Sequence, residues 1–245
     1  MAPALKSTFE RGGSADRTGP SASGGHVIIF LNIPFTTTRL RAGLTAALGA
    51  DRCQFAKGEA HAKTLSMRAP KSDGHILVAT MPLEAAVALA DGGLITTFVG
   101  RPEPRLTAAW RAAIADPKHP DHADAHTFRI VEALAEARPF AARQNNLATK
   151  LLAPGGAPDG GAAVKALAAA NTLVGWAAHP FAYADALERA LKLPSGTLER
   201  GLFNAPLPTN ADGPFGTLAR TQNAADIALL KGLATASGGA PVFRP

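Results

Sequence analysis

The chain has 245 residues, of which 47% are hydrophobic and 18% charged, so it can bury a substantial core and is most simply one domain, with two small domains as the alternative. The formal net charge of +6 suits an anionic ligand, but the basic residues are scattered and not interleaved with aromatic residues, which argues against a nucleic-acid-binding protein. The single cysteine, Cys53, excludes an internal disulfide and a cysteine-rich metal site, and we expect a cytoplasmic protein.

The N-terminal residues 1–25 are rich in Gly, Ser, Pro and charged residues and lack an apolar segment. They are therefore expected to form a disordered tail and not a secretion signal. No stretch of the chain reaches the roughly 20 apolar residues that span a bilayer. The predicted domain covers residues 26–235, and residues 236–245 are expected to fray.

The first predicted unit is a strand followed by a loop and a helix. The apolar run Val27–Leu31 is typical of a strand buried on both faces of a parallel sheet, and Pro34 ends it. The loop Phe35–Thr38 then leads to a helix over 39–48, whose first N–H groups lack internal partners and can bind a phosphate. Because the loop has no glycine and no Gly-Lys-Ser/Thr, an ordinary unit without a ligand is the alternative.

Strands and helices alternate along the rest of the chain. After a polar stretch over 51–73, strands are predicted at 76–79, 94–100 and 171–175, and helices at 82–91, 101–117, 127–152 with a break near Pro139, 162–170, 181–191 and 222–233. Such alternation favours parallel pairing through right-handed crossovers. The predicted fold is therefore α/β, with three layers and a mostly parallel central sheet flanked by helices.

Four segments occur in the order and approximate spacing of a known enzyme family: FLNIPFTTTRLRAGL, GHILVATMP, TFVGRPEPRLTAAW and RQNNLATKLL. Together they make the chain resemble the family-2 type of PAPS-dependent sulfotransferases over roughly residues 26–233. The resemblance implies a P-loop-like architecture with PAPS as co-substrate. It also implies direct in-line transfer of a sulfuryl group to a hydroxyl of a small-molecule or carbohydrate acceptor.

The resemblance implies that the loop after the first strand binds the 5′-phosphosulfate of PAPS. The family has Ile-Pro-Lys-Thr-Gly-Gly-Thr-Ser here, and its place is taken by Pro34, Phe35, Thr36, Thr37, Thr38 and Arg39. Phe35 stands where the family has a lysine that neutralises the leaving oxygen, and Thr37 with its neighbours replaces two glycines. Arg39 is then the candidate catalytic cation.

The second family motif, Phe-Val-Arg-Asp-Pro-x-x-Arg, implies a site for the 3′-phosphate. Gly100 stands at the first arginine position, Arg101 at the aspartate position and Ala108 at the position of a downstream serine. The phosphate contacts then fall to Arg101, Arg105 and Thr107. Guanidinium groups suit this role because they donate hydrogen bonds in a fork.

The pair Gly74-His75 is similar to the Gly-His from which many family members take their catalytic base. A histidine titrates near neutrality and can accept the acceptor's hydroxyl proton, whereas the alternative is a strand-edge histidine with one backbone hydrogen bond. Residues 143–147 resemble a helical Asn/Gln element on the acceptor side of the family's site. Residues 177–179 occupy a region where a family-like glutamate is absent.

Two other readings remain open. The segment His119-Pro-Asp121-His122-Ala-Asp124-Ala-His126 holds three imidazoles and two carboxylates, enough ligands for zinc or nickel, although capping of the next helix by Asp124 or Thr127 also accounts for it. The predicted transferase site needs no metal. A chain without the family lysine and first arginine can also retain the architecture as an inactive or divergent protein that binds another anion or a protein partner.

Overall fold

The computed structural model describes residues 28–37, 39–68, 74–199 and 201–245. The predicted tail over 1–25 and the loop residue Thr38 lie outside the described residues.

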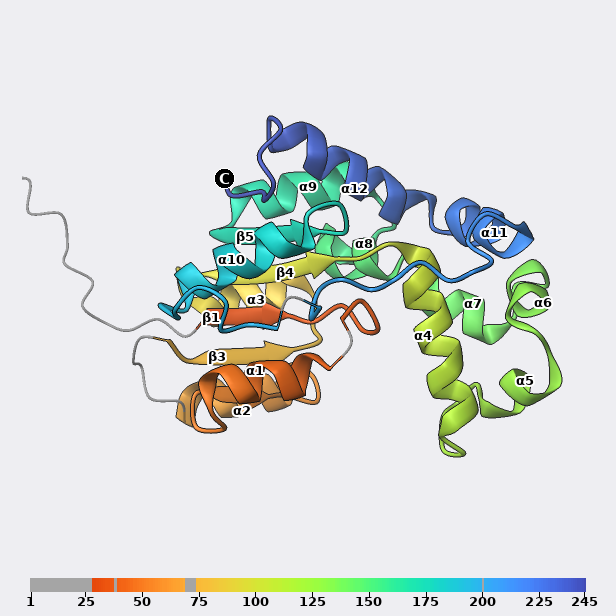
Figure 1. Cartoon of the computed structure of the whole chain (residues 1–245), viewed down its shortest axis with the longest axis horizontal. Helices are drawn as coiled ribbons and strands as arrows, with labels where there is room; N and C mark the ends of the chain where they lie inside the picture. The colour runs from red at the N-terminus through yellow and green to blue at the C-terminus, as the bar shows by residue number, and fades with distance from the viewer. Residues whose placement is uncertain (1–27, 38, 69–73, 200) are drawn as a thin grey trace, which may run out of the picture.

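One parallel sheet organises the fold (Figure 1). Its strands are β1 (Ile28–Leu31), β2 (Cys53–Phe55), β3 (Ile76–Ala79), β4 (Ile95–Val99) and β5 (Thr172–Trp176). They pair in parallel in the order β2-β3-β1-β4-β5, which places β1 at the centre. The first connections are α1 (Leu40–Leu48), α2 (Glu59–Arg68) and α3 (Leu83–Ala90).

Two apolar layers cover the sheet, one on each face. Along β1, Ile28 and Phe30 pack with α1 and with α10 (Pro180–Ala190). The alternate residues Ile29 and Leu31 pack with α3, α8 (Leu147–Leu152), α9 (Gly160–Ala169) and α12 (Ala224–Ala236). The residues of β1, β3, β4 and β5 are all buried, and most of them are apolar, because both faces of the sheet are covered. This arrangement confirms the predicted three-layer α/β fold.

A third core lies beyond the carboxyl ends of the strands, in a helical extension (Figure 1). It contains α4 (Pro102–Ala115), α5 (His122–Thr127), α6 (Ile130–Ala135), α7 (Pro139–Gln144) and α11 (Pro214–Gln222). The rings of Trp110 and Phe140 meet edge to face at 4.7 Å between centroids, and Phe215 of α11 joins the same cluster. The extension therefore packs through aromatic contacts between segments distant in the sequence.

The structure adds elements that the sequence did not predict. The polar stretch over 51–73 contains β2 and α2, and α11 lies mostly between the helices predicted at 181–191 and 222–233. The predicted frayed end also differs, because α12 extends to Ala236 and Phe243 exchanges two backbone hydrogen bonds of 2.9 Å with Val174. The strand β2 has only three residues at a sheet edge, too few for a periodic pattern.

The close packing of α9 on α12 can be tested with two neighbouring glycines. A Cβ on Gly160 would lie 2.5 Å from the backbone nitrogen of Leu229, whereas a Cβ on Gly161 would lie no closer than 3.4 Å to Asp159 Oδ1. We expect Gly160→Ala to lower the free energy of unfolding by about 1–3 kcal/mol in urea denaturation, because backbone must move. Gly161→Ala should leave it unchanged or raise it by up to about 1 kcal/mol. Equal losses in both variants would contradict this contact.

Candidate functional site

The sheet topology leaves a crevice at its carboxyl edge, between β1 and β4. The connection from β1 passes through α1 on one face of the sheet, whereas the connection from β4 returns through α8 and α9 on the other face. Because β1 and β4 are neighbours, their connections diverge at the ends of these strands. Open α/β sheets bind ligands in such crevices.

A cavity of about 220 Å³ opens at this crevice, hereafter the β4–β5 cavity. Its walls are formed by Thr36, Phe98, Gly100, Arg101, Pro104, Arg105, Ala177 and residues 203–207. A Cβ on Gly100 would lie 3.2 Å from Thr36 Cβ, so the absence of a side chain lets the loop after β1 approach the turn after β4. The two sequence segments assigned to the nucleotide therefore lie against each other.

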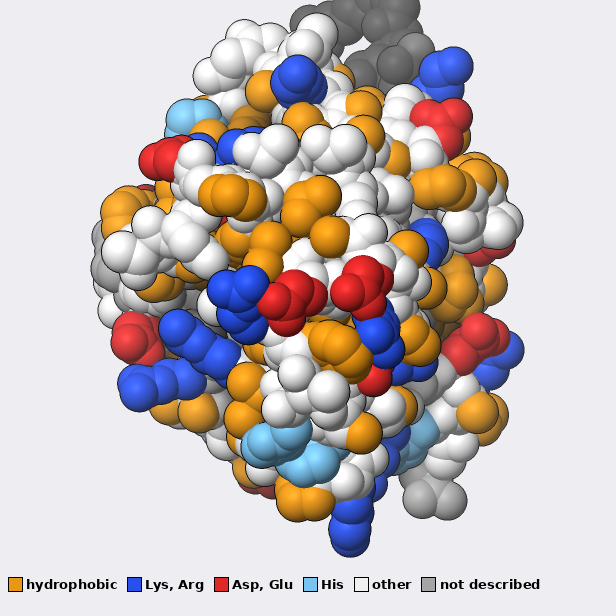
Figure 2. Space-filling view, turned by 90° about the vertical axis from the view of Figure 1, so that its right-hand side faces the viewer, with side chains coloured by type: hydrophobic (Ala, Val, Ile, Leu, Met, Phe, Trp, Pro, Cys, Tyr) orange, Lys and Arg blue, Asp and Glu red, His pale blue; other side chains and the backbone are white. Residues whose placement is uncertain are grey.

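Three arginines supply positive charge at this edge. Arg39 is the N-cap residue of α1, Arg101 is the N-cap residue of α4, and the guanidinium of Arg41 lies 4.4 Å from the Phe55 ring centroid. No carboxylate of the described residues forms an ion pair with any of them. On the face of the molecule in Figure 2, Lys and Arg side chains are interspersed with Asp and Glu.

The loop after β1 is shaped by its own hydrogen bonds. Thr36 is only 3% exposed, and both its backbone nitrogen and its Oγ1 donate to the Ile33 carbonyl, at 3.2 and 2.6 Å. Phe35 and Arg39 adopt left-handed conformations, with φ of 63° and 60°. Pro34 is half-buried at the start of this turn. The Thr36 hydroxyl therefore stabilises the loop and is not a free donor for a phosphate.

The helix that follows offers unpaired backbone donors. The first hydrogen bond of α1 runs from the Gly43 nitrogen to the Arg39 carbonyl, at 2.8 Å. The N–H groups of Leu40, Arg41 and Ala42 therefore have no partner within the helix, and the helix dipole makes this end attractive to anions. The amino end of α1 therefore presents backbone donors that suit an anion.

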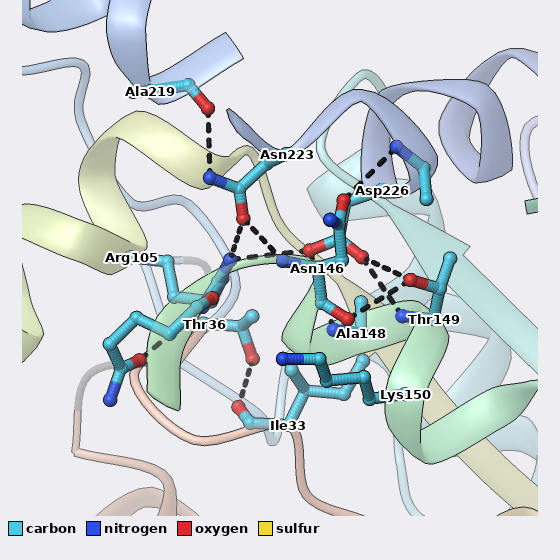
Figure 3. Close-up of polar contacts among 12 residues, drawn as sticks. Ile33, Thr36, Arg105, Asn146, Ala148, Thr149, Lys150, Ala219, Asn223 and Asp226 are labelled. Carbon is cyan, nitrogen blue, oxygen red and sulfur yellow. Dashed lines mark hydrogen bonds and ion pairs between the residues drawn. The ribbon is translucent and has the colours of Figure 1, made fainter. Parts of the chain in front are cut away.

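Arg105 lies in a different environment from the one that the resemblance implied (Figure 3). It is 1% exposed; Nη1 donates to the carbonyl and Oε1 of Gln144, at 2.8 and 3.4 Å, and Nη2 donates to Asn223 Oδ1 and Asp226 Oδ2, at 2.8 and 3.2 Å. The four terminal N–H groups thus all have protein acceptors. Burial lowers the pKa of Arg105, and Asp226 opposes that shift. Its terminal donors are not available to a 3′-phosphate.

Asp226 and two asparagines complete this buried network (Figure 3). Asp226 accepts hydrogen bonds from the backbone nitrogens of Ala148 and Thr149, at 3.3 and 2.9 Å, in the first turn of α8. Asn223 Oδ1 accepts from the Asn146 nitrogen at 2.8 Å, and Asn146 Oδ1 accepts from the Ala225 nitrogen at 3.0 Å. Residues 143–147, which resemble an acceptor-side element of the family, therefore link α8 to α12 through Asn146.

The other predicted site residues do not meet at the loop. The Thr107 hydroxyl donates to the Glu103 carbonyl at 3.0 Å, within α4. His75 precedes β3, and its carbonyl accepts from the Ile28 nitrogen at 3.0 Å, at the amino edge of the sheet. The four residues of β3 separate this edge from the loop by roughly 13 Å at about 3.3 Å per residue. The prediction of His75 as the base is therefore incompatible with a reaction at the loop.

The histidine segment packs one helix onto another. The rings of His122 and His126 lie on one face of α5, with 4.3 Å between their centroids. His122 Nδ1 forms a hydrogen bond with the Ala113 carbonyl at 2.9 Å, and His126 Nε2 forms one with the Ile114 carbonyl at 3.3 Å, at the end of α4. Within the described ranges, no group of three or more His, Cys, Asp or Glu side chains is arranged to hold a metal. The next helix, α6, is capped through Glu132 and not through Asp124 or Thr127.

The buried ion pair gives a direct stability test. Asp226→Asn keeps the size of the side chain but leaves the Arg105 charge without its counter-charge, so we expect a loss of about 3–5 kcal/mol in the free energy of unfolding by urea denaturation. The control is Glu59→Gln, which breaks the exposed pair with Lys63 and should cost less than about 1 kcal/mol. Equal losses would show that the buried pair does not stabilise the fold.

Comparisons of the chain with protein-family models, with curated proteins and with solved structures each find no match. No helix in the described part of the chain is long and apolar enough to cross a membrane.

Proposed function

We propose that the carboxyl edge of the sheet binds a phosphate-bearing nucleotide, and that this nucleotide is PAPS, as the resemblance implies. The 5′-phosphosulfate is held by the loop over 34–39 and the first N–H groups of α1, and Arg101 binds phosphate in the β4–β5 cavity. One observation carries the proposal: Thr36 and Arg101 line a single cavity at the crevice where the connections from β1 and β4 diverge. The proposal replaces Arg105 by Arg101 as the main phosphate contact.

The proposed reaction is sulfuryl transfer to a hydroxyl of a small-molecule or carbohydrate acceptor. The acceptor oxygen forms a bond to sulfur while the bond from sulfur to the 5′-phosphate oxygen breaks, PAP leaves, and the hydroxyl proton passes to a base or to water. Such a reaction gains mainly from positioning and charge stabilisation. Arg39 is the proposed cation at the leaving oxygen, since it is exposed at the end of the loop.

Binding without transfer is the second candidate function. It is favoured by Phe35 in the lysine position and by His75 at the opposite edge of the sheet. The Cys53 thiol offers no alternative nucleophile, because burial raises its pKa to about 12. In this second function the same crevice binds an anionic ligand without transferring a group, and the protein's role is to bind that ligand or a protein partner.

Calorimetric titration with PAP tests the binding step. Arg101→Ala should weaken binding roughly 10- to 100-fold, because one charge-assisted hydrogen bond to phosphate is lost. The control is Arg111→Ala, which removes an exposed arginine from the same helix and should leave the dissociation constant unchanged. Absence of heat with PAP, or equal affinities in the two variants, would contradict the proposed site.

Incubation with PAPS and a panel of hydroxyl acceptors separates transfer from binding alone, because only transfer produces a sulfated acceptor. If transfer occurs, Arg39→Ala should lower kcat by roughly 100-fold, since a cation at the developing charge is removed. His75→Ala should change kcat by less than about twofold, because His75 lies at the other edge of the sheet. A tenfold fall in kcat for His75→Ala would place the reaction elsewhere.

A further inference from the structure

A second cavity of about 250 Å³ lies at the carboxyl ends of β2 and β3, hereafter the β2–β3 cavity. Its walls are formed by Asn32, Phe35, Thr37, Leu40, Arg41, Phe55, Ala56 and residues 78–80. The loop after β1 separates it from the β4–β5 cavity, since Thr36 lines one cavity while Phe35 and Thr37 line the other. A ligand that crosses the loop would therefore place one part on each side.

One side of the β2–β3 cavity suits a flat ring. Phe35 and Phe55 are both half-buried residues of the lining; the Phe35 side chain also packs against the third core, so Phe55 supplies the main aromatic surface. The Arg41 guanidinium, which also lines the cavity, already lies over Phe55 at 4.4 Å from the ring centroid. Phenyl rings and guanidinium planes are the surfaces on which proteins stack nucleic-acid bases.

Polar groups stand beside these rings. Asn32 Nδ2 donates to Thr80 Oγ1 at 3.4 Å, and Thr80 Oγ1 donates to the Asn32 carbonyl at 3.1 Å, which fixes the Asn32 side chain at the end of β1. Asn32 Oδ1 has no hydrogen-bond partner among the described residues. An asparagine amide offers one acceptor and a second N–H, the pattern that matches the amino group and ring nitrogen of adenine.

The volume and the charge of the β2–β3 cavity limit which part of a ligand it can hold. None of the described residues that line the β2–β3 cavity carries a carboxylate. Its volume is below the roughly 300–1,000 Å³ of pockets that enclose drug-sized ligands, so it fits one ring system and not a whole nucleotide. The phosphates of a nucleotide would then lie outside it, toward the unpaired N–H groups of α1 and the β4–β5 cavity.

We propose that the β2–β3 cavity binds the adenine base of the nucleotide whose phosphates bind across the loop. This inference rests on the proposed function and assigns the base to Phe55, Arg41 and Asn32. The base stacks on the wall formed by Phe55 and Arg41, and its amino edge meets the Asn32 amide. The ribose and 5′-phosphate then pass over Thr36 and Thr37.

The test compares Phe55 with Phe128, because each of these rings has an arginine guanidinium over its face. In titrations with PAP, Phe55→Leu and Phe55→Ala should weaken binding roughly 5- to 100-fold, because base stacking on the ring is lost. The control is Phe128→Ala, which removes a ring that lies 3.7 Å from the Arg138 guanidinium, outside both cavities, and should leave PAP binding unchanged. Phe55→Leu retains apolar volume, and its thermal unfolding confirms that the variant is folded.

Adenosine supplies the second measurement, because it carries the base without phosphate. Adenosine should displace PAP from the original protein, and Phe55→Leu but not Arg101→Ala should weaken adenosine binding. If PAP binds and depends on Arg101 but not on Phe55, or if adenosine fails to displace it, the base lies elsewhere and only this inference is overturned. If PAP does not bind the original protein, the proposed function is overturned as well.

Discussion

All strands of the sheet run in the same direction, and this constraint decides which residues can meet. It gathers the ends of β1, β2, β3, β4 and β5 at one edge, together with the first turns of the helices that follow them. Those first turns carry unpaired N–H groups and the positive ends of helix dipoles. The same constraint places His75 at the opposite edge, roughly 13 Å from the described part of the loop after β1.

The buried pair of Arg105 and Asp226 joins the helical extension to the sheet layers. Arg105 belongs to α4, which begins directly after the turn with Gly100 and Arg101, while Asp226 belongs to α12. The N–H groups of α8 also bind Asp226, so the carboxylate is satisfied from two sides. Buried charges are tolerated when they are paired and fully hydrogen-bonded. The network therefore fixes the start of α4, and with it the wall of the β4–β5 cavity that holds Arg101.

The sequence predicted the fold where burial is complete. Apolar and β-branched runs identified β1, β3, β4 and β5, and their alternation with helices indicated the parallel sheet that the structure confirms. The strand β2 and the helix α2 were missed because both lie in a polar stretch at the sheet edge. Their formation depends on contacts with β3 and its neighbours, which local sequence does not encode.

The site was predictable only in part. The order of the segments placed the loop near Gly100 and Arg101, but Arg105 binds Asp226, 121 residues away, and a single sequence carries no signal for that pairing. For His75 a signal was present: a residue that precedes a strand lies at the amino edge of a parallel sheet, away from a loop that follows another strand. The two cavities depend on side chains from several strand ends and could not be derived from any one segment.

Amide chemical shifts recorded during titration with PAP test the central claim most directly, because each backbone N–H reports its own surroundings. The account predicts shifts at Thr36, Leu40, Arg41, Gly100 and Arg101, with no change at the amino edge around Gly74 and Ile76. Shifts confined to the amino edge, or none at saturating PAP, would contradict the assignment of the carboxyl edge as a nucleotide site.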